Sequence, residues 1–65
     1  MKLVHLYEIA IGELFTIPGF PEERFSPVRA PLCRQVEVVL MESKTPECKG
    51  SKTWMMANDL VFRVD

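Results

Sequence analysis

Four of the five prolines in this 65-residue chain fall within fourteen consecutive residues, at Pro18, Pro21, Pro27 and Pro31. Proline fixes its own φ angle and disfavours helical backbone at the residue before it, so this stretch cannot form a regular helix. Apolar runs that can pair as strands flank it on both sides. We therefore predict a stiffened, proline-rich loop over residues 18–33 that joins two strands.

The chain is short and its charges nearly balance. A domain of 65 residues buries only about 60% of the surface that its unfolded chain exposes. Its 48% hydrophobic and 26% charged residues are typical of a globular protein, and a formal net charge of −1 gives no general attraction for a polyanion. We expect a single small domain over residues 1–65.

The clearest strand spans residues 34–41, where apolar and polar side chains alternate. Three apolar side chains share one face of it: Val36, Val38 and Leu40. Val39 and Met41 break the alternation. This end of the strand is therefore expected either to be covered on both faces or to carry an apolar patch that a partner uses.

Other segments complete a β-structure. Strand patterns occupy residues 13–17, 53–57 and 60–65, and residues 42–52 read as an exposed connection. A short helical turn fits near residues 6–10. The sequence predicts an all-β fold, either a small antiparallel barrel or a strongly bent sheet, with four or five strands.

One family resemblance covers most of the chain. A leucine and a hydrophobic-Gly-acid-x-Phe step open the first long strand, and a short apolar strand closes the sheet. The matching residues are Leu6, Ile11, Gly12, Glu13 and Phe15 at the opening, and Leu60, Phe62 and Val64 at the close. In these features the chain resembles small phage and bacterial proteins of SH3-like barrel type. The resemblance implies a fold and a phage or prophage setting, but no activity, because such barrels host unrelated functions.

No reaction chemistry is indicated. His5 is the only histidine, and although Glu8 lies three residues on, no nucleophile accompanies them. Cys33 and Cys48 lack CxxC spacing and histidine partners, so no zinc site is expected. We recognise no signal peptide and expect both to be cytosolic free thiols, with Cys33 buried and inert. We predict a protein with no enzymatic activity, cofactor, metal or membrane span.

The proline-rich segment suits a protein partner. Stiffened backbone loses less entropy on docking, and aromatic and arginine side chains are enriched in interface hot spots. The predicted contact set is Phe20, Arg24, Phe25, Arg29 and Arg34, with Glu22 and Glu23 at its rim. An open sheet edge offers a second route: if the strand over 34–41 or the one over 60–65 lies at an edge, it can pair with a partner or a second copy.

We therefore expect a protein-binding module in the cytoplasm, a phage-encoded factor that occludes or modulates a host protein such as an enzyme or a defence complex. Two alternatives stay open. A nucleic-acid-binding barrel needs cations and stacking aromatics, which the arginines and Trp54 can supply, although we expect Trp54 and Phe62 to pack in the core. The other alternative is a small structural or self-associating protein.

Overall fold

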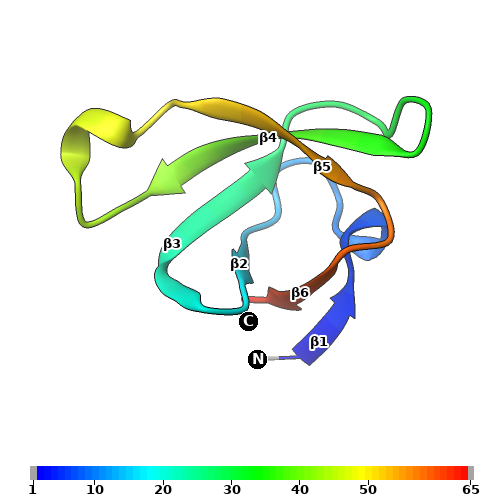
Figure 1. The fold of residues 1–65 in the computed structure, drawn as a ribbon, viewed down its shortest axis with the longest axis horizontal. Coiled ribbons are helices and arrows are strands. Elements are labelled where there is room, and N and C mark those ends of the chain that lie inside the picture. Colours follow the sequence, from blue (N-terminus) through cyan, green and yellow to red (C-terminus); the bar gives the residue numbers. More distant parts are fainter. Residues whose placement is uncertain (1, 65) are drawn as a thin grey trace.

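Alternating apolar side chains build an antiparallel six-stranded sheet, with strand order β1-β6-β2-β3-β4-β5 (Figure 1). The computed structural model describes residues 2–64. Its strands are β1 (Lys2–His5), β2 (Phe15–Ile17), β3 (Phe20–Pro27), β4 (Gln35–Glu42), β5 (Lys52–Met56) and β6 (Leu60–Arg63). Two single 3₁₀ turns join them, η1 (Leu6–Glu8) and η2 (Pro46–Cys48).

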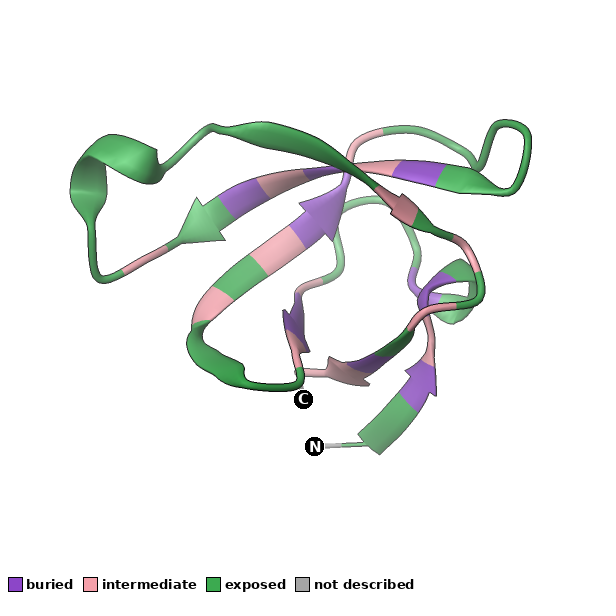
Figure 2. Ribbon diagram, viewed as in Figure 1, coloured by how far each residue is buried: buried purple, intermediate pink, exposed green. Residues whose placement is uncertain are grey.

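The sheet curls around one hydrophobic cluster, and Figure 2 shows buried residues on β4 and also on β1 and β6. The buried members are Val4, Leu6, Ile9, Phe15, Val36, Val38 and Val61. Within β4, Val36, Val38 and Leu40 are buried, which confirms the face predicted from the alternation. Curling lets a single sheet cover both sides of a small core.

The sheet does not close into a barrel, and it has six strands where the sequence predicted four or five. β1 and β5 remain as its two edges. Where a barrel would continue its ladder, η1 is tied to the β5–β6 turn by two backbone bonds: Leu6 N–H donates to Asp59 O at 2.8 Å, and Tyr7 N–H donates to Ala57 O at 2.9 Å. Of the two predicted architectures, the closed barrel is therefore wrong, and the open, curled sheet (Figure 1) agrees with the strongly bent sheet that was the alternative. The all-β class is confirmed.

The proline-rich segment is not one loop. Strand β3 occupies residues 20–27 and pairs with both β2 and β4, so the predicted loop at 18–33 was wrong over half of its length. Pro27 fits because Val28 N–H donates to the Glu37 carbonyl oxygen at 3.0 Å. Successive residues of a strand point their backbone groups to opposite sides, so the nitrogen of Pro27 faces away from β4 and no ladder bond is lost there.

A strained two-residue turn leads into β4. Leu32 and Gln35 exchange backbone hydrogen bonds of 2.7 and 2.9 Å around Cys33 and Arg34. These two central residues have φ angles of +52° and +66°. Two positive φ angles define the type I′ hairpin turn, a geometry that normally selects asparagine and glycine.

Three other predicted elements are found, but the edges of the sheet are formed by other strands than those considered. The helical turn expected near residues 6–10 is η1, and the strands expected at 53–57 and 60–65 are β5 and β6, although Asp65 lies outside the described residues. The two strands considered for pairing with a partner if they lay at a sheet edge, β4 and β6, both lie inside the sheet. The free edges belong to β1 and β5 instead.

Candidate functional site

The outward face of β4 and β5 carries a group of exposed apolar side chains. Met55 packs against the core, so the alternation of β5 turns Trp54 and Met56 outward, each 44% exposed. Across the ladder, Trp54 lies opposite Glu37 and Met56 opposite Gln35. We call this surface the β5 face, made of Val39, Met41, Trp54 and Met56.

This finding corrects one expectation and resolves another. Trp54 does not pack in the core as predicted, whereas Phe62 is half-buried. Met41 is 46% exposed and Val39 is half-buried, so the irregular end of β4 carries an apolar patch and is not covered on both faces.

The β5 face adjoins free backbone. Successive residues of an antiparallel strand point their N–H and C=O groups alternately toward and away from the neighbouring strand. Met56 uses its outward groups within the turn: its N–H donates to Asp59 Oδ2 and its C=O accepts from Asp59 N–H, both at 3.0 Å. By the same alternation, the N–H and C=O groups of Lys52 and Trp54 also point away from β4. No strand of the described chain pairs with that side of β5.

Cations flank this edge. Lys49 and Lys52 lie at the start of β5, and Arg34 lies beside its end, where it lines a hollow of about 330 Å³ with Tyr7 and Met56. Among residues 2–64, none of these three cations has a carboxylate within ion-pair distance. Against these three cations stands the carboxylate of Asp59 at Met56, so the edge keeps a local excess of positive charge in a chain whose net charge is −1.

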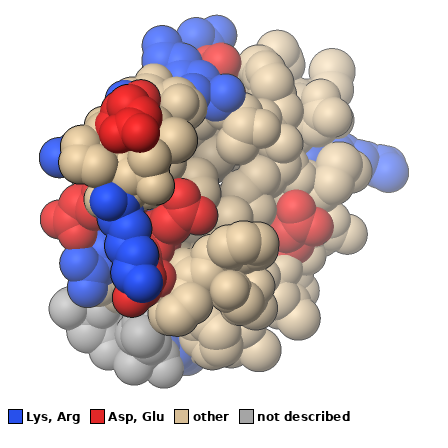
Figure 3. Space-filling model, turned by 60° about the vertical axis from the view of Figure 1, so that its left-hand side comes forward, with Lys and Arg blue, Asp and Glu red and all other residues tan. Residues whose placement is uncertain are grey.

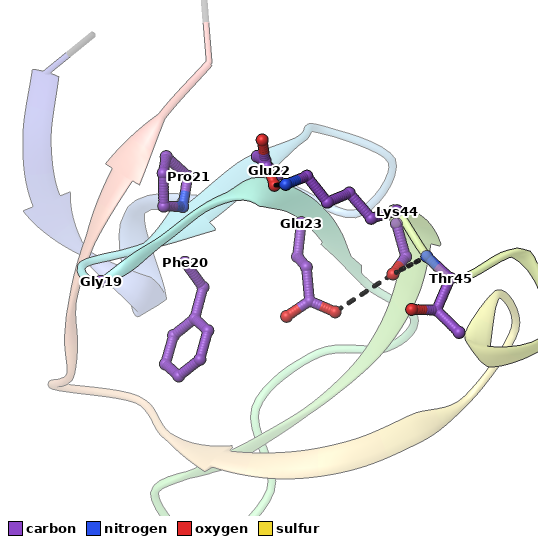
Figure 4. A pocket seen from close by; sticks show the side chains of 8 residues that line it. Gly19, Phe20, Pro21, Glu22, Glu23, Lys44 and Thr45 are labelled. Atoms are coloured by element: carbon purple, nitrogen blue, oxygen red, sulfur yellow. Dashed lines mark hydrogen bonds and ion pairs between the residues drawn. The ribbon is translucent and has the colours of Figure 1, made fainter.

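A second concave surface lies beside the start of β3. It is a hollow of about 320 Å³, and we call it the Phe20 pocket. Figure 4 shows the Phe20 ring and the Glu23 carboxylate on one side of β3, with Pro21 and Glu22 on the other. The full lining is Gly19, Phe20, Pro21, Glu22, Glu23, Ser43, Lys44 and Thr45.

Ion pairs neutralise most of the charge around the Phe20 pocket. Lys44 Nζ is 2.6 Å from Glu22 Oε2, and Arg24 Nη1 is 2.6 Å from Glu42 Oε2. Glu23 accepts a hydrogen bond of 3.3 Å from Ser43 Oγ. Figure 3 shows the resulting mixture of both signs on this side of the molecule. These contacts link β3 to the end of β4 and to the residues that follow it. They leave little net charge around the Phe20 pocket.

The structure does not gather the five predicted contact residues. Phe20 lines the Phe20 pocket together with Glu22 and Glu23, whereas Arg24 lies outside its lining and pairs with Glu42. Phe25 turns inward and stacks on Phe15, with ring centroids 5.8 Å apart. The remaining two lie near the opposite end of β4: Arg34 borders the β5 face, and Arg29 Nε is 3.0 Å from Glu37 Oε1. The eight residues of β4 separate these groups by roughly 23 Å.

The sulfur and histidine chemistry is limited. Cys33 is exposed, so its predicted burial was wrong; Cys48 is exposed too, and both thiols are free. The half-exposed His5 ring stacks on Tyr7 at 5.1 Å. The backbone N–H of His5 donates to Glu8 Oε2 at 2.8 Å, and this bond holds the pKa of Glu8 below its ordinary value of 4.5.

The part of the chain that the structure describes contains no group of three or more His, Cys, Asp or Glu side chains placed to hold a metal ion. Within the same residues, no helix is long and apolar enough to cross a membrane. Comparison with known proteins finds no matching family model, no matching curated protein and no matching solved structure. Function must therefore be argued from the surfaces themselves.

Proposed function

We propose that this protein is a non-enzymatic protein-binding module that docks through the β5 face. The observation that carries the proposal is the outward position of Trp54 and Met56 on a strand whose outer edge is unpaired. The core of this small domain contains few apolar side chains, yet two large ones, Trp54 and Met56, remain nearly half exposed to water. Burying them against a partner would recover the stabilisation that the fold itself forgoes.

The residue types fit this use. Tryptophan is the side chain most enriched in interface hot spots, and its indole gives a large contact area with few rotatable bonds. Methionine adapts to irregular partner surfaces because its side chain is unbranched and flexible. Two residues of the sequence-based contact set, Arg29 and Arg34, lie beside the face and would form part of its rim.

The mechanism that we propose is steric. The bound module covers the surface of the partner that it contacts and performs no chemistry there. A phage-encoded factor that occludes a host protein is the biological setting that the sequence resemblance suggests, and it stays a prediction.

Single-stranded nucleic acid is the second candidate, favoured by one observation. Trp54 is exposed and the cations near it are unpaired, which is the combination that stacking platforms use. Two facts weigh against it. The chain's net charge of −1 gives no general attraction for a polyanion, and three cations give a small counterion-release gain.

Affinity capture from the native cell, with a matched pair of variants, tests the proposal. Trp54→Ala removes the anchor of the β5 face, whereas Leu3→Ala removes a similarly exposed side chain from β1, the opposite edge of the sheet. We expect Leu3→Ala to retain the captured protein and Trp54→Ala to lose it. Equal capture by both variants would contradict the proposal. Capture that disappears after nuclease treatment would favour the nucleic-acid candidate.

A further inference from the structure

We infer that the free edge of β5 takes an extended, acidic segment of the partner as a seventh strand of the sheet. The inference rests on the proposed function of the β5 face and names the chemistry of its occupant. Three features of the edge carry it: unpaired backbone groups, an apolar centre and cations at both ends.

The backbone defines where the added strand begins and ends. Asp59 already satisfies both outward groups of Met56, so pairing stops there. Lys52 and Trp54 present two N–H donors and two C=O acceptors in a row, the pattern that an extended peptide meets when it joins a sheet. A five-residue segment, about 17 Å long, spans β5.

The side chains define what the segment carries. Lys52, Trp54 and Met56 share the outward face of β5, and Arg34 lies beside Met56. A partner strand places every second side chain on the same face. The complementary pattern is therefore acid-x-apolar, with a carboxylate near Lys52 and an apolar side chain against Trp54, and it ends at Met56, where the edge already carries the carboxylate of Asp59.

A second copy of this chain fits the edge less well. If two β5 strands paired antiparallel about Trp54, Lys52 of one copy would lie opposite Met56 of the other. Because Asp59 already occupies the outward groups of Met56, Lys52 would find no backbone partner there, and only the Trp54 groups of the two copies could pair. The positions of the free backbone groups favour a partner peptide over self-pairing.

Peptide titration of the isotope-labelled full chain tests the inference. The probe is an acetylated, amidated peptide of sequence SETVTES, compared with SKTVTKS and with a SETVTES analogue that carries an N-methyl group on its valine. Amide signals of Lys52 and Trp54 report the edge, and Trp54 emission reports the face. We expect the glutamate peptide to bind about five-fold more tightly than the lysine peptide at low salt, because ion pairs at an exposed rim are modest in strength.

Two further measurements separate strand pairing from simple charge attraction. N-methylation removes a backbone donor and blocks close approach, so the analogue is expected to lose most of the binding. Lys52→Glu is expected to reduce the preference for the glutamate peptide, while Lys2→Glu, the same charge change on β1, is expected to leave it intact. The spectra of both variants also show whether they remain folded.

The outcomes distinguish this inference from the proposed function. Equal binding of glutamate and lysine peptides, undiminished binding of the N-methyl analogue, or no shift with millimolar peptide overturns the seventh strand. So does tighter binding of a labelled oligothymidine, or self-association on sizing with no response to peptide. Any of these results, together with partner capture that still depends on Trp54, leaves the protein-binding function standing. Capture that ignores Trp54 removes that function itself.

Discussion

Trp54 lies directly across the β4–β5 ladder from Glu37, on the face of the sheet that points away from the core. The carboxylate of Glu37 is held by Arg29, whose Nε is 3.0 Å from Oε1. This ion pair neutralises the one acid beside the indole. An acidic partner segment can therefore approach Trp54 without meeting an uncompensated negative charge.

The environment of Trp54 can be read by fluorescence, because it is the only tryptophan in the chain. Its 44% exposure predicts a native emission maximum close to that of a solvated indole, and efficient quenching by acrylamide. We expect unfolding in urea to shift the maximum only slightly to the red, and partner binding to shift it to the blue. A native spectrum typical of a buried indole, with little quenching, would contradict the outward position of Trp54.

Two phenylalanines give a matched test of the core. Phe15 is fully buried, whereas Phe20 is 57% exposed. Phe15→Ala is expected to cost about 3–5 kcal/mol, a large share of the roughly 3–10 kcal/mol that stabilises a domain of this size, so that variant should be strongly destabilised. Phe20→Ala is expected to stay within about 1 kcal/mol of the parent chain. Urea unfolding followed by circular dichroism measures both; similar losses for the two variants would place the core elsewhere.

The sequence predicted the all-β class because period-two alternation is strong where one face is buried, as at Val36 and Val38. It missed β3. Proline is rare in central strands, so Pro21 and Pro27 read as loop. The structure accommodates Pro21 at the start of β3, and at Pro27 the missing donor faces a side of the strand where no ladder bond is needed. Which backbone groups need partners depends on register, which a single sequence does not supply.

The turn at Cys33 and Arg34 predicts a stabilising double substitution. Both residues have positive φ angles, which cost side chains with a Cβ about 1 kcal/mol or more each. Cys33→Asn with Arg34→Gly supplies the residues that a type I′ turn selects. We expect the free energy of unfolding to rise by about 1 kcal/mol, since glycine's extra freedom in the unfolded chain offsets part of the gain. Arg34→Ala keeps the strain and should give little change; a destabilised double variant would argue against this turn geometry.

The candidate site was harder to predict than the fold. Alternation shows that Trp54 and Met56 share a face, but not whether that face is covered, and core packing is the usual fate of tryptophan. The five residues of the predicted contact set do not lie together, for a related reason. Its residues were grouped by proximity in sequence, yet β3 and β4 carry Arg24 and Arg34 to opposite ends of a hairpin. The exposure of Trp54 and Met56 could have been suspected because β5 is short and flanked by polar residues. Only the strand order shows that β5 is an edge.

The two thiols should behave independently. Cys33 precedes β4 and Cys48 follows it, so the strand separates them by far more than the 7 Å over which Cα atoms can be bridged by a disulfide. Both are exposed, and we expect the native protein to react with two equivalents of a thiol reagent at similar rates. Mild oxidation should give dimers on non-reducing gels and no faster-migrating monomer. An intramolecular disulfide, identified by mass spectrometry of the native monomer, would contradict the separation.

Acid stability should depend on Glu8. The hydrogen bond from His5 N–H favours the ionised carboxylate in the folded chain and holds the pKa of Glu8 below 4.5, whereas unfolding restores the ordinary value. A lowered folded pKa contributes stability above the unfolded pKa, and that contribution is lost as the pH falls through the folded one. Between about pH 5 and about pH 3, the urea midpoint of Glu8→Gln is therefore expected to fall less steeply than that of the parent chain. Glu47→Gln, in η2, serves as the control and should keep the parent dependence; identical slopes for all three proteins would show that the bond to His5 does not persist in solution.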